Sequence, residues 1–408
     1  FTANISEMKI GIIKEGKTPP DRRVPLSPKH CEILLQRYPN LEIAVQPSDI
    51  RAFKDSEYQN LNIPLQEDLS DCDLLLGVKE VPIAMLLPHK RYMFFSHTYK
   101  KQEYNRDLLK AILAKKVSLI DYEMLKDPGG KRLLGFGRYA GIVGCYNGFR
   151  AYGKLSGQYD LKPAHLCHDR LELESELVKV VLPKNFRIAI SGAGRVAGGA
   201  MEILSALKIT QVYPDEFIRE DFNQEAVYTQ LNVQDYFRRC DGKDFKRKDF
   251  YQDSKGYESN FLTYAAHADM YVACHYWSEE SPFIFDREMA RDWNFNIKLV
   301  ADISCDIDGP VASTIRPSTI ADPFYAYDPI SEKEVALGTE GSIAVSAVDN
   351  LPGELPRDAS EDFGNELLKN VIPHFFNEDE LGILDKATET TLAGNLNSHY
   401  SYLEDYIA

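Results

Sequence analysis

The sequence predicts an α/β protein of two domains with parallel sheets. With 408 residues, the chain is too long for a single ordinary hydrophobic core. Short apolar runs bounded by turns alternate with helical patterns, which is the order expected of strand–helix–strand units. One of these runs, residues 186–191, breaks into glycines and then into a helical pattern. That order of strand, glycine turn and helix predicts a doubly wound sheet.

The first part of the chain carries a series of predicted strands and helices. The predicted strands are 8–13, 42–45, the run that begins at Asp73, the run that begins at Tyr92, and 117–122. One helix begins at Pro28, where Ser27 is suited to cap it, and another is expected over 102–115. The alternation predicts a parallel sheet covered by helices.

Three successive predicted strands in this part end in a polar side chain. These residues are Lys79, His97 and Glu123. Ligands gather outside the carboxyl ends of parallel strands, and a histidine there is suited to proton transfer because its unperturbed pKa lies near neutrality. Each residue taken alone could be structural, but their recurrence at comparable strand ends predicts a catalytic site.

The loop before Pro28 is dense in cations. It carries Lys14, Lys17, Arg22 and Arg23. Arginine binds carboxylates through two parallel hydrogen bonds, so this loop is a candidate site for an acidic substrate. A loop that is merely solvated is the alternative.

The glycine turn predicts a dinucleotide site. Gly192 permits a tight turn, and Gly194 lets the backbone approach a pyrophosphate. The helix that follows begins at Arg195 and Val196, where unpaired N–H groups and the helix dipole favour an anion. Ala197 replaces the third glycine of the usual pattern, and it is still small enough for close helix packing. A glycine turn without a ligand is the alternative.

Two acidic residues bear on the bound dinucleotide. Asp215 follows the second glycine at about the spacing of an acid that holds ribose hydroxyls, which favours NAD and does not exclude NADP. Pro214 and Glu216 beside it leave this assignment open. Asp306 follows another predicted strand, 297–303, where the nicotinamide end would lie, although an aspartate in such a turn is more often structural.

The domain organisation follows from the order of these elements. A dinucleotide-binding domain is expected over 137–339, inserted into a substrate domain built from 1–136 and 340–408, and both are expected to be Rossmann-like. The small residues of 135–144 allow close packing of a long helix, which suits a connection between domains.

Three further segments complete the prediction. The polar segment 232–256 is expected to be an insertion or a mobile surface loop, because it has no sustained basic face. Helices are expected around 361–375 and 378–399. No internal repeat or coiled coil is recognisable.

Composition limits the partners. The formal net charge of −15 argues against a nucleic-acid or anionic membrane surface. The 7 cysteines are scattered, without a Cys-x-x-Cys pair, which fits reduced thiols in a cytoplasm better than disulfides or a metal site. No signal peptide and no run of about 18 apolar residues is recognisable. We therefore expect a cytoplasmic protein that acts on small molecules, with monomer or homo-oligomer undecided.

Several short stretches, in order over nearly the whole chain, carry a family resemblance. They are 77–82 (GVKEVP), 95–100 (FSHTYK), 121–123 (DYE), 136–141 (FGRYAG), 302–306 (DISCD) and 348–352 (VDNLP). They resemble the lysine-forming saccharopine dehydrogenases and the lysine–2-oxoglutarate reductase domains, within the wider group that includes alanine dehydrogenase. The stretch 136–144 is similar to the saccharopine branch and differs from alanine dehydrogenases.

The resemblance implies catalytic residues. Lys79 and His97 would form an acid/base pair, and Glu123 would tune the charge of Lys79. Asp349 would lie close to the reacting amine. These roles come from similarity to the family and not from spacing.

The resemblance also implies residues that bind the substrate. Arg23 matches the arginine that binds the substrate carboxylate, and Lys17 is a second match in a loop of different length. Lys100 would add positive charge near a substrate acid.

The implied reaction interconverts saccharopine with L-lysine and 2-oxoglutarate. A hydride passes between the carbon of the secondary amine and nicotinamide, water adds to the resulting imine, and the carbinolamine breaks down. Two alternatives stay open. One is an alanine dehydrogenase that uses pyruvate and ammonia, and the other is a nucleotide-binding protein without turnover.

Overall fold

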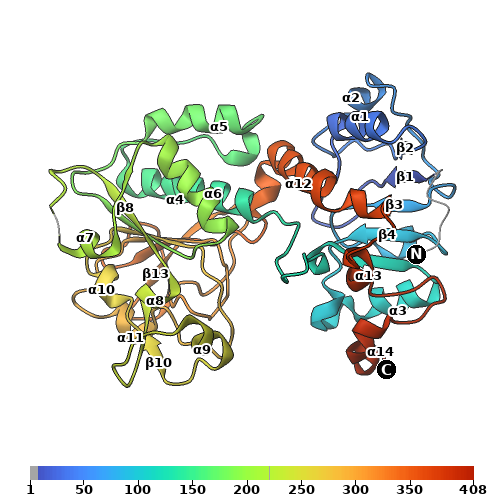
Figure 1. Ribbon diagram of the computed structural model, residues 1–408. Helices are drawn as coiled ribbons and strands as arrows, with labels where there is room; N and C mark the ends of the chain where they lie inside the picture. The colour runs from blue at the N-terminus through green and yellow to red at the C-terminus, as the bar shows by residue number, and fades with distance from the viewer. Residues whose placement is uncertain (1–7, 220) are drawn as a thin grey trace. The chain divides into compact units, whose positions relative to one another are not determined.

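The computed structural model describes residues 8–219 and 221–408 and divides into two compact units (Figure 1). Unit 1 combines the chain up to Phe136 with Pro356–Ala408, and unit 2 is Gly137–Leu355. One unit is thus inserted into the other in sequence, while residues 1–7 of the expected first domain lie outside the described residues.

The second boundary differs from the expected residue 340. Strand β15 (Ile343–Ser346) pairs with β12 (Leu299–Asp302) and β13 (Phe324–Asp328), both of unit 2. Because these backbone hydrogen bonds complete the sheet of unit 2, residues 340–355 belong to that unit.

Unit 1 is built on a five-stranded parallel sheet in the order β2-β1-β3-β4-β5. Its strands are β1 (Lys9–Ile12), β2 (Glu42–Val45), β3 (Leu74–Leu76), β4 (Arg91–Phe94) and β5 (Ser118–Asp121). They are nearly continuous apolar runs because both faces of the sheet are buried. From β1 the chain passes to β2, which pairs with one side of β1, and the next strand, β3, pairs with the other side of β1. The carboxyl ends of β1 and β3 therefore form the topological switch point, where ligands of such sheets bind.

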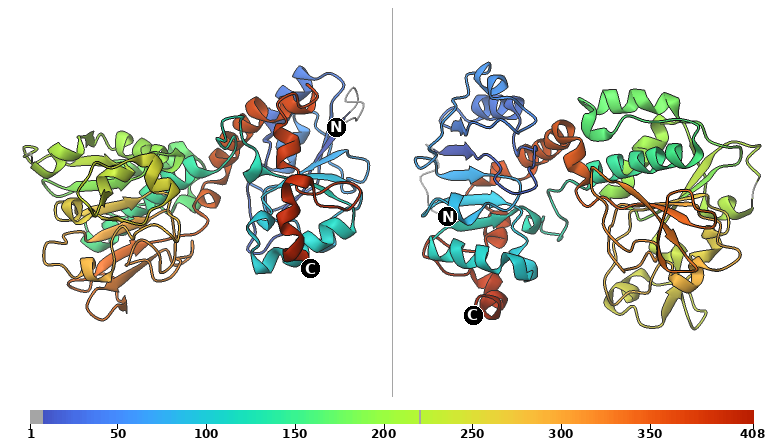
Figure 2. Two further views of the ribbon diagram at one scale, coloured as in Figure 1. Left: turned by 60° about the horizontal axis from the view of Figure 1, so that its bottom comes forward. Right: turned by 180° about the vertical axis from the view of Figure 1, so that it is seen from behind.

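Helices cover both faces of this sheet. They are α1 (Pro28–Arg37), α2 (Asp55–Gln59), α3 (Arg106–Ala114), α12 (Pro356–Asn370), α13 (Ile383–Ala387) and α14 (Glu404–Ile407), with short 3-10 turns η1 (Ile83–Met85), η2 (Thr98–Lys100), η3 (Glu103–Asn105), η4 (Tyr122–Met124), η8 (Ile372–Phe375) and η9 (Ser398–Leu403). Ser27 caps α1, as predicted. Helices α1 and α12 lie side by side (Figure 2) and pack on one face, and α3 packs on the other.

The helix predicted over 378–399 is wrong. Only α13 forms there, and the chain then extends along β5: Thr388 bridges Ile120, and the backbone N–H of Glu389 donates to the carbonyl of Leu119 (2.8 Å). The threonines around Glu389 prefer extended backbone, and the edge of β5 offers them hydrogen-bond partners.

Unit 2 is built on an eight-stranded sheet in the order β14-β13-β15-β12-β11-β6-β8-β7. Its remaining strands are β6 (Arg187–Ser191), β7 (Thr210–Gln211), β8 (Val227–Leu231), β11 (Met270–Ala273) and β14 (Lys333–Val335). The run from β15 to β7 is parallel, and β13 and β14 extend it with antiparallel pairs. The switch point of this sheet lies at β6, between β11 and β8.

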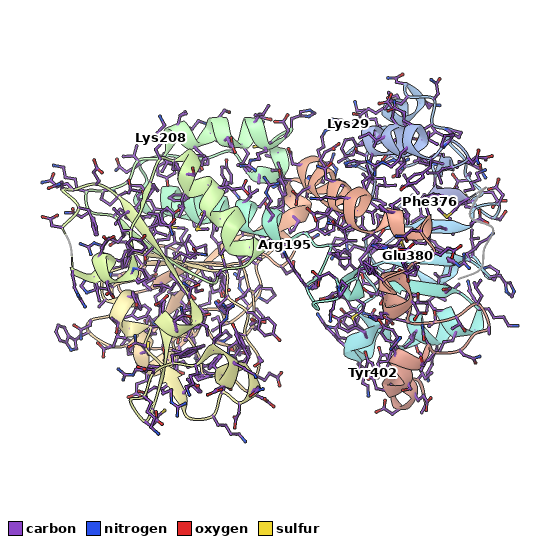
Figure 3. The ribbon with its side chains drawn as sticks, in the orientation of Figure 1. Lys29, Arg195, Lys208, Phe376, Glu380 and Tyr402 are labelled. Carbon is purple, nitrogen blue, oxygen red and sulfur yellow. The ribbon has the colours of Figure 1, made fainter. Side chains whose placement is uncertain are left out.

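The helices of unit 2 pack around this sheet. They are α4 (Gly137–Ser156), α5 (Arg170–Glu176), α6 (Arg195–Ala206), α7 (Pro214–Arg219), α8 (Val233–Tyr236), α9 (Arg247–Gln252), α10 (Leu262–Ala265) and α11 (Arg287–Ala290), with 3-10 turns η5 (Ala164–Leu166), η6 (Leu177–Lys179) and η7 (Leu351–Glu354). Arg195, labelled in Figure 3, begins α6 directly after the glycine turn.

Glycines let α4 and α6 approach backbone to backbone. A Cβ on Gly141 would lie 1.9 Å from the carbonyl oxygen of Val196, and one on Gly199 would lie 1.9 Å from that of Arg138. The close packing that the small residues of 135–144 predict is confirmed, and it holds α6 against the sheet.

The segment 232–256 is a folded part of unit 2, so of the two expected alternatives, insertion or mobile surface loop, the loop is wrong. It contains α8, β9 (Phe237–Arg239) and α9, and β9 pairs with β10 (Tyr257–Ser259) as an antiparallel ribbon. Phe237 and Phe250 are buried in it, although the segment as a whole is polar in composition. No helix of residues 8–219 and 221–408 is long and apolar enough to cross a membrane.

Candidate active site

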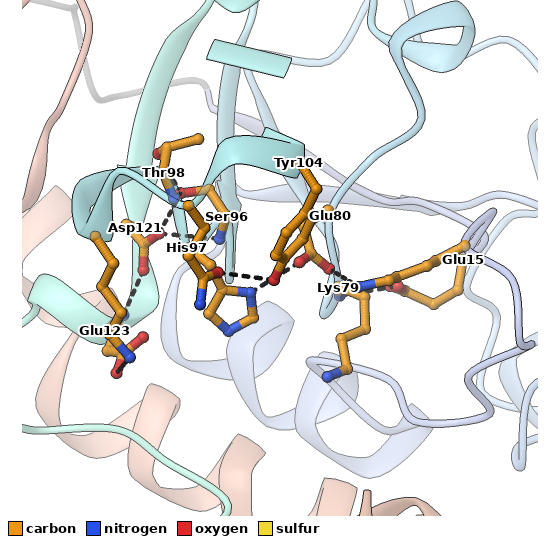
Figure 4. Close-up of polar contacts among 12 residues, drawn as sticks. Glu15, Lys79, Glu80, Ser96, His97, Thr98, Tyr104, Asp121 and Glu123 are labelled. Carbon is orange, nitrogen blue, oxygen red and sulfur yellow. Dashed lines mark hydrogen bonds and ion pairs between the residues drawn. The ribbon is translucent and has the colours of Figure 1, made fainter. Parts of the chain in front are cut away.

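Lys79 follows β3 at the switch point of unit 1. The Glu15 carboxylate, which follows β1, accepts the backbone N–H groups of Val78 (2.6 Å) and Lys79 (2.9 Å) (Figure 4). Both strand ends are thereby joined at the position where Lys79 leaves the sheet. Burial raises the pKa of Glu15 to about 7, although these two N–H donors lower it.

The environment of Lys79 lowers the pKa of its ammonium group. Burial lowers the pKa of the Lys79 ammonium, and the positive charge of Arg23 lowers it further, while Asp21 and Glu80 act in the opposite direction. A lysine whose pKa is depressed can exchange a proton with a substrate near neutral pH.

Glu80 connects His97 with Lys17. Its Oε1 accepts a hydrogen bond from Nδ1 of His97 (2.8 Å), and its Oε2 lies 2.6 Å from Nζ of Lys17. Burial raises the pKa of Glu80, but the hydrogen bonds from His97 and Lys17 bring it down to about 2. An ionised carboxylate only accepts hydrogen bonds, so Nδ1 of His97 carries a proton in this contact.

Arg23, the predicted carboxylate-binding residue, is buried and paired within the protein. Its Nε and Nη2 donate to the two oxygens of Asp21 (3.0 and 2.6 Å), and its guanidinium lies over the ring of Phe136, 4.3 Å from the centroid. Both charged side chains are almost inaccessible, at 3% and 2% exposed. Arg23 therefore acts on Lys79 by its charge, while Lys17, at 36% exposed, is far more accessible than Arg23.

Glu123 forms ion pairs with Lys100 and Arg132 and not with Lys79, so its implied effect on the charge of Lys79 stays a prediction. Its Oε1 lies 3.2 Å from Nζ of Lys100 and 3.2 Å from Nη1 of Arg132. The carboxylates that act on Lys79 are Asp21 and Glu80. Lys100 is nearly half exposed, as a cation for a substrate acid requires.

The glycine turn in unit 2 has the backbone that a dinucleotide site needs. Gly192 has φ +102°, and a Cβ there would lie 2.4 Å from the carbonyl oxygen of Cys274, so only glycine fits. At Gly194, the N-cap of α6, a Cβ would meet no atom within 4 Å. The space beside Gly194, at the positive end of the helix, is the cradle that a pyrophosphate would occupy.

This turn opens into a pocket of about 430 Å³. Its other walls come from the ends of β8 and β11 and from α9. The lining residues are Gly192, Ala193, Gly194, Arg195, Val196, Asn232, Val233, Tyr236, Arg247, Tyr251, Cys274, His275 and Tyr276. The predicted residues Gly192, Gly194, Arg195 and Val196 thus line one cavity, and Arg247 and Tyr251 come from the segment 232–256.

Asp215 does not line this pocket. It lies in the first turn of α7, after the edge strand β7, and β8 separates β7 from β6. The residue that follows the strand next to β6 is therefore Asn232, which does line the pocket. The spacing rule failed because β7, the strand that follows β6 in sequence, lies at the edge of the sheet, and the strand after it, β8, pairs with β6.

His275 is a site residue that the sequence prediction missed. It follows β11, lines the pocket and is buried, with Nδ1 3.0 Å from Oγ of Ser191 and Nε2 3.4 Å from Oγ of Ser304. Burial lowers the pKa of His275 to about 4, so the ring is neutral at physiological pH. The rule that selected His97, a histidine at a strand end, would also have selected this residue.

Asp306 and Asp349 follow the neighbouring strands β12 and β15 of unit 2. Burial raises the pKa of Asp306 to about 6, and the charge of Asp302 adds to this rise. Burial likewise raises the pKa of Cys305 to about 12, with further contributions from Asp302, Asp349 and Asp306. The two predicted acids therefore both follow the carboxyl ends of adjacent parallel strands, and Asp349 is exposed there.

The predicted residues divide between the two units. Unit 1 holds Lys17, Arg23, Lys79, His97, Lys100 and Glu123, and unit 2 holds Gly192, Gly194, Arg195, Val196, Asp215, Asp306 and Asp349. The prediction missed Glu15, Asp21 and Glu80, although Glu80 lies inside the GVKEVP stretch. Among residues 8–219 and 221–408, no group of three or more histidine, cysteine, aspartate or glutamate side chains could hold a metal ion.

Comparisons with known proteins agree with the resemblance. The family model described as alanine dehydrogenase/PNT, N-terminal domain, matches residues 11–143. The alpha-aminoadipic semialdehyde synthase of Arabidopsis thaliana is 29% identical over 437 residues, covering 97% of this chain and 41% of that protein. The mitochondrial synthase of Bos taurus is 31% identical over 392 residues (86% and 42%). The chain thus spans about two fifths of the length of these relatives.

Relatives of similar length are dehydrogenases. The lysine-forming, NAD(+) saccharopine dehydrogenase of Schizosaccharomyces pombe is 26% identical over 370 residues, covering 87% of this chain and 90% of that protein. A solved L-alanine dehydrogenase shares the fold, with a TM-score of 0.65 at 17% identity, over 98% of this chain and 100% of that one. The chain is therefore a homologue of the alpha-aminoadipic semialdehyde synthases and the lysine-forming saccharopine dehydrogenases, as its motifs predicted.

Proposed function

We propose that this chain is a nicotinamide-dependent amino-acid dehydrogenase that interconverts saccharopine with L-lysine and 2-oxoglutarate. The observation that carries the proposal is the group at the switch point of unit 1. There, Lys79 has a lowered pKa and lies next in sequence to Glu80, which fixes the protonation of Nδ1 of His97. Such a pair supplies the two proton-transfer groups that oxidation of a secondary amine and hydrolysis of the imine require.

Each group has a role that fits its atoms. Neutral Lys79 accepts the proton that leaves the secondary amine as the hydride departs. Nε2 of His97 then accepts a proton from the water that attacks the imine carbon, while Lys79 returns its proton to the nitrogen, which gives the carbinolamine. As the C–N bond breaks, His97 donates its proton to the lysine nitrogen and Lys79 accepts the hydroxyl proton, so that the carbonyl of 2-oxoglutarate forms. Lys17 and Lys100 attract the carboxylates of the substrate to an otherwise acidic protein. In the reverse direction each proton moves the opposite way.

The residues of unit 2 fit a nicotinamide dinucleotide, which supplies or accepts the hydride when bound. Gly194 leaves space for the pyrophosphate at the first turn of α6. The NAD preference expected from Asp215 loses its basis, because Asn232 takes the place of that acid. Arg195 and Arg247 line the same pocket, and none of its lining residues is acidic. We therefore propose that the pocket accepts the 2′-phosphate of NADP(H).

The test follows nicotinamide absorbance with the full chain. Lysine plus 2-oxoglutarate should oxidise NADPH faster than NADH, and saccharopine should support the reverse reaction. Turnover with pyruvate plus ammonia alone would instead identify an alanine dehydrogenase, which the family model over residues 11–143 and the shared fold support. Nucleotide binding without turnover of either pair would identify a silent binding protein.

Location is not part of this proposal. The bovine relative is named as mitochondrial, and the cytoplasmic location stays a prediction from cysteine usage.

A further inference from the structure

A chain of four side-chain oxygens lies beside the His97 turn. Oδ2 of Asp121 lies 2.5 Å from Oγ of Ser96, Oγ of Ser96 lies 2.7 Å from Oγ1 of Thr98, and Oγ1 of Thr98 lies 2.6 Å from Oε2 of Glu389. All four residues are buried. Figure 4 shows Ser96, Thr98 and Asp121 next to His97, which Ser96 and Thr98 flank in sequence.

This row of four hydrogen-bonded oxygens needs one proton more than the two hydroxyl groups in it supply. It has three oxygen–oxygen contacts of hydrogen-bond length, and each contact holds one proton. The hydroxyls of Ser96 and Thr98 supply one proton each. The third proton must therefore belong to a carboxyl group at one end of the chain.

Asp121 is the better placed of the two carboxyl groups to be ionised: burial raises its pKa, but hydrogen bonds from Ser96 and Glu123 lower it. Its Oδ2 accepts the backbone N–H of Ser96 (2.9 Å) as well as the Ser96 hydroxyl, and its Oδ1 accepts the backbone N–H of Glu123 (2.7 Å). Three donors on one carboxyl group favour the charged form. Asp121 also joins the ends of β4 and β5 by these bonds.

Glu389 has the surroundings of a neutral acid. Within the described residues, the only hydrogen-bond partner of its carboxyl group is Thr98, and its Oε1 is buried without one. The charged groups that act on it, Asp121 and Glu123, are both acids. Burial and the charge of Asp121 raise its pKa well above the usual range. An ionised Glu389 would be a buried charge without compensation.

We infer that Glu389 carries the third proton and, through Thr98 and Ser96, positions His97 for proton transfer. The bonds then run in one direction: Glu389 donates to Thr98, Thr98 to Ser96, and Ser96 to Asp121. The backbone of His97 has φ +56°, in the left-handed region. Residues other than glycine keep this conformation when the surrounding structure holds it. These hydrogen bonds hold Ser96 and Thr98, the residues immediately before and after His97. This positioning role rests on the proposed function of His97.

The experiment compares two variants of nearly equal size in the full chain. In Glu389→Gln the amide N–H takes over the donation to Thr98, whereas Glu389→Leu has no donor. At about pH 9, where Glu15 (pKa about 7) and Asp306 (pKa about 6) are ionised, the infrared band of a protonated carboxyl should be present in the wild-type protein and absent from both variants. The His97 imidazole signals, assigned with His97→Gln, should keep their wild-type NMR shifts in Glu389→Gln and move in Glu389→Leu.

Turnover should follow the same order. We expect kcat to stay within about 3-fold of wild type in Glu389→Gln and to fall about 10-fold or more in Glu389→Leu, with unchanged nucleotide affinity. Thr98→Ser, which keeps the hydroxyl, and Thr98→Val, which removes it, give a second pair with the same expected order if Glu389→Leu does not fold.

Three results would overturn the inference: a carboxyl band that survives in Glu389→Gln, equal effects of Gln and Leu on kcat, or unmoved His97 signals in Glu389→Leu. The infrared and NMR results do not depend on any substrate. A wild-type protein that turns over neither substrate pair would therefore refute the proposed function separately.

Discussion

Oε1 of Glu80 accepts a hydrogen bond of 2.8 Å from Nδ1 of His97, so a buried carboxylate sets which nitrogen of the imidazole carries the proton. The same carboxylate lies 2.6 Å from Nζ of Lys17. Sequence analysis selected His97 and Lys17 separately, and Glu80, which it did not select, binds both of them. Removal of this single charge should affect both partners.

Glu80→Gln should lower kcat by about 10-fold or more, because the hydrogen bond to His97 is no longer assisted by charge. Stability should also change with pH. The pKa of Glu80 falls to about 2 on folding, so its contribution, at most about 3 kcal/mol, is complete above its unfolded pKa and lost as pH falls toward 2. Urea unfolding from pH 7 to pH 2 should therefore show wild type and Glu80→Gln converging at low pH.

Glu67→Gln is the matched control for this variant. Glu67 forms an exposed ion pair with Lys14, and its loss should cost less than about 1 kcal/mol at any pH. A constant difference between Glu80→Gln and wild type across the pH range would contradict the assigned ionisation of Glu80.

Lys79→Met should lower kcat by about 10²-fold or more, with little change in nucleotide affinity. In the oxidative direction the base must be neutral, so the rate should rise with pH through the pKa of Lys79. Because that pKa is lowered, the inflection should lie below 10.5 and should vanish in the variant. His97→Gln should cause a similar fall in kcat. A Lys79→Met enzyme with the wild-type pH profile would show that another group is the base.

Arg23→Ala should destabilise the protein by about 3–5 kcal/mol, because it leaves the buried Asp21 carboxylate without its partner. The double variant Asp21→Ala/Arg23→Ala should recover part of this loss, since neither charge then remains unpaired. Denaturant unfolding of the two single variants and the double variant measures the coupling. If Arg23→Ala folds normally and loses only affinity for 2-oxoglutarate, then Arg23 binds the substrate as the resemblance implied.

The two glycines of the turn should respond differently to substitution by alanine. In Gly194→Ala the new Cβ meets no protein atom within 4 Å, so the melting temperature should stay unchanged while dinucleotide affinity falls about 10-fold or more. In Gly192→Ala the positive φ and the carbonyl of Cys274 should destabilise the fold itself. Thermal unfolding and nucleotide titration of both proteins separate the effects. Unchanged affinity in Gly194→Ala would place the pyrophosphate elsewhere.

Arg247→Ala should weaken NADPH about 10-fold, which is the loss expected of one charged hydrogen bond, and should leave NADH nearly unchanged. Asn232→Asp should shift the preference toward NADH, because an acid there would accept ribose hydroxyls and repel a 2′-phosphate. Asp215→Ala, an exposed change outside the pocket, is the control and should alter neither affinity. A selective loss of NADH binding in Asp215→Ala would restore the original assignment of that residue.

Local pattern did not predict β8, β13 and β15, but it was sufficient for the five strands of unit 1, for β6 and β12 of unit 2, and for the positions of Lys79, His97 and the glycine turn. Each depends on a short apolar run and the residue that follows it, and those are properties of neighbouring residues in the chain. The C-terminal segment shows the limit of such patterns. Residues 378–399 suggested a helix, yet Glu389 lies on extended chain, because the free edge of β5 supplies hydrogen bonds that are far away in sequence.

The sequence by itself determined the α/β class, the insertion of one unit into the other and the ends of strands at which polar residues gather. Only the tertiary structure decided the partner of each charge: Arg23 pairs with Asp21, and Glu123 pairs with Lys100. It also decided that Asn232, not Asp215, follows the strand beside β6. The physical reason is that strand formation and turns depend on adjacent residues, whereas ion pairs and strand order depend on which distant segments the folded chain brings together.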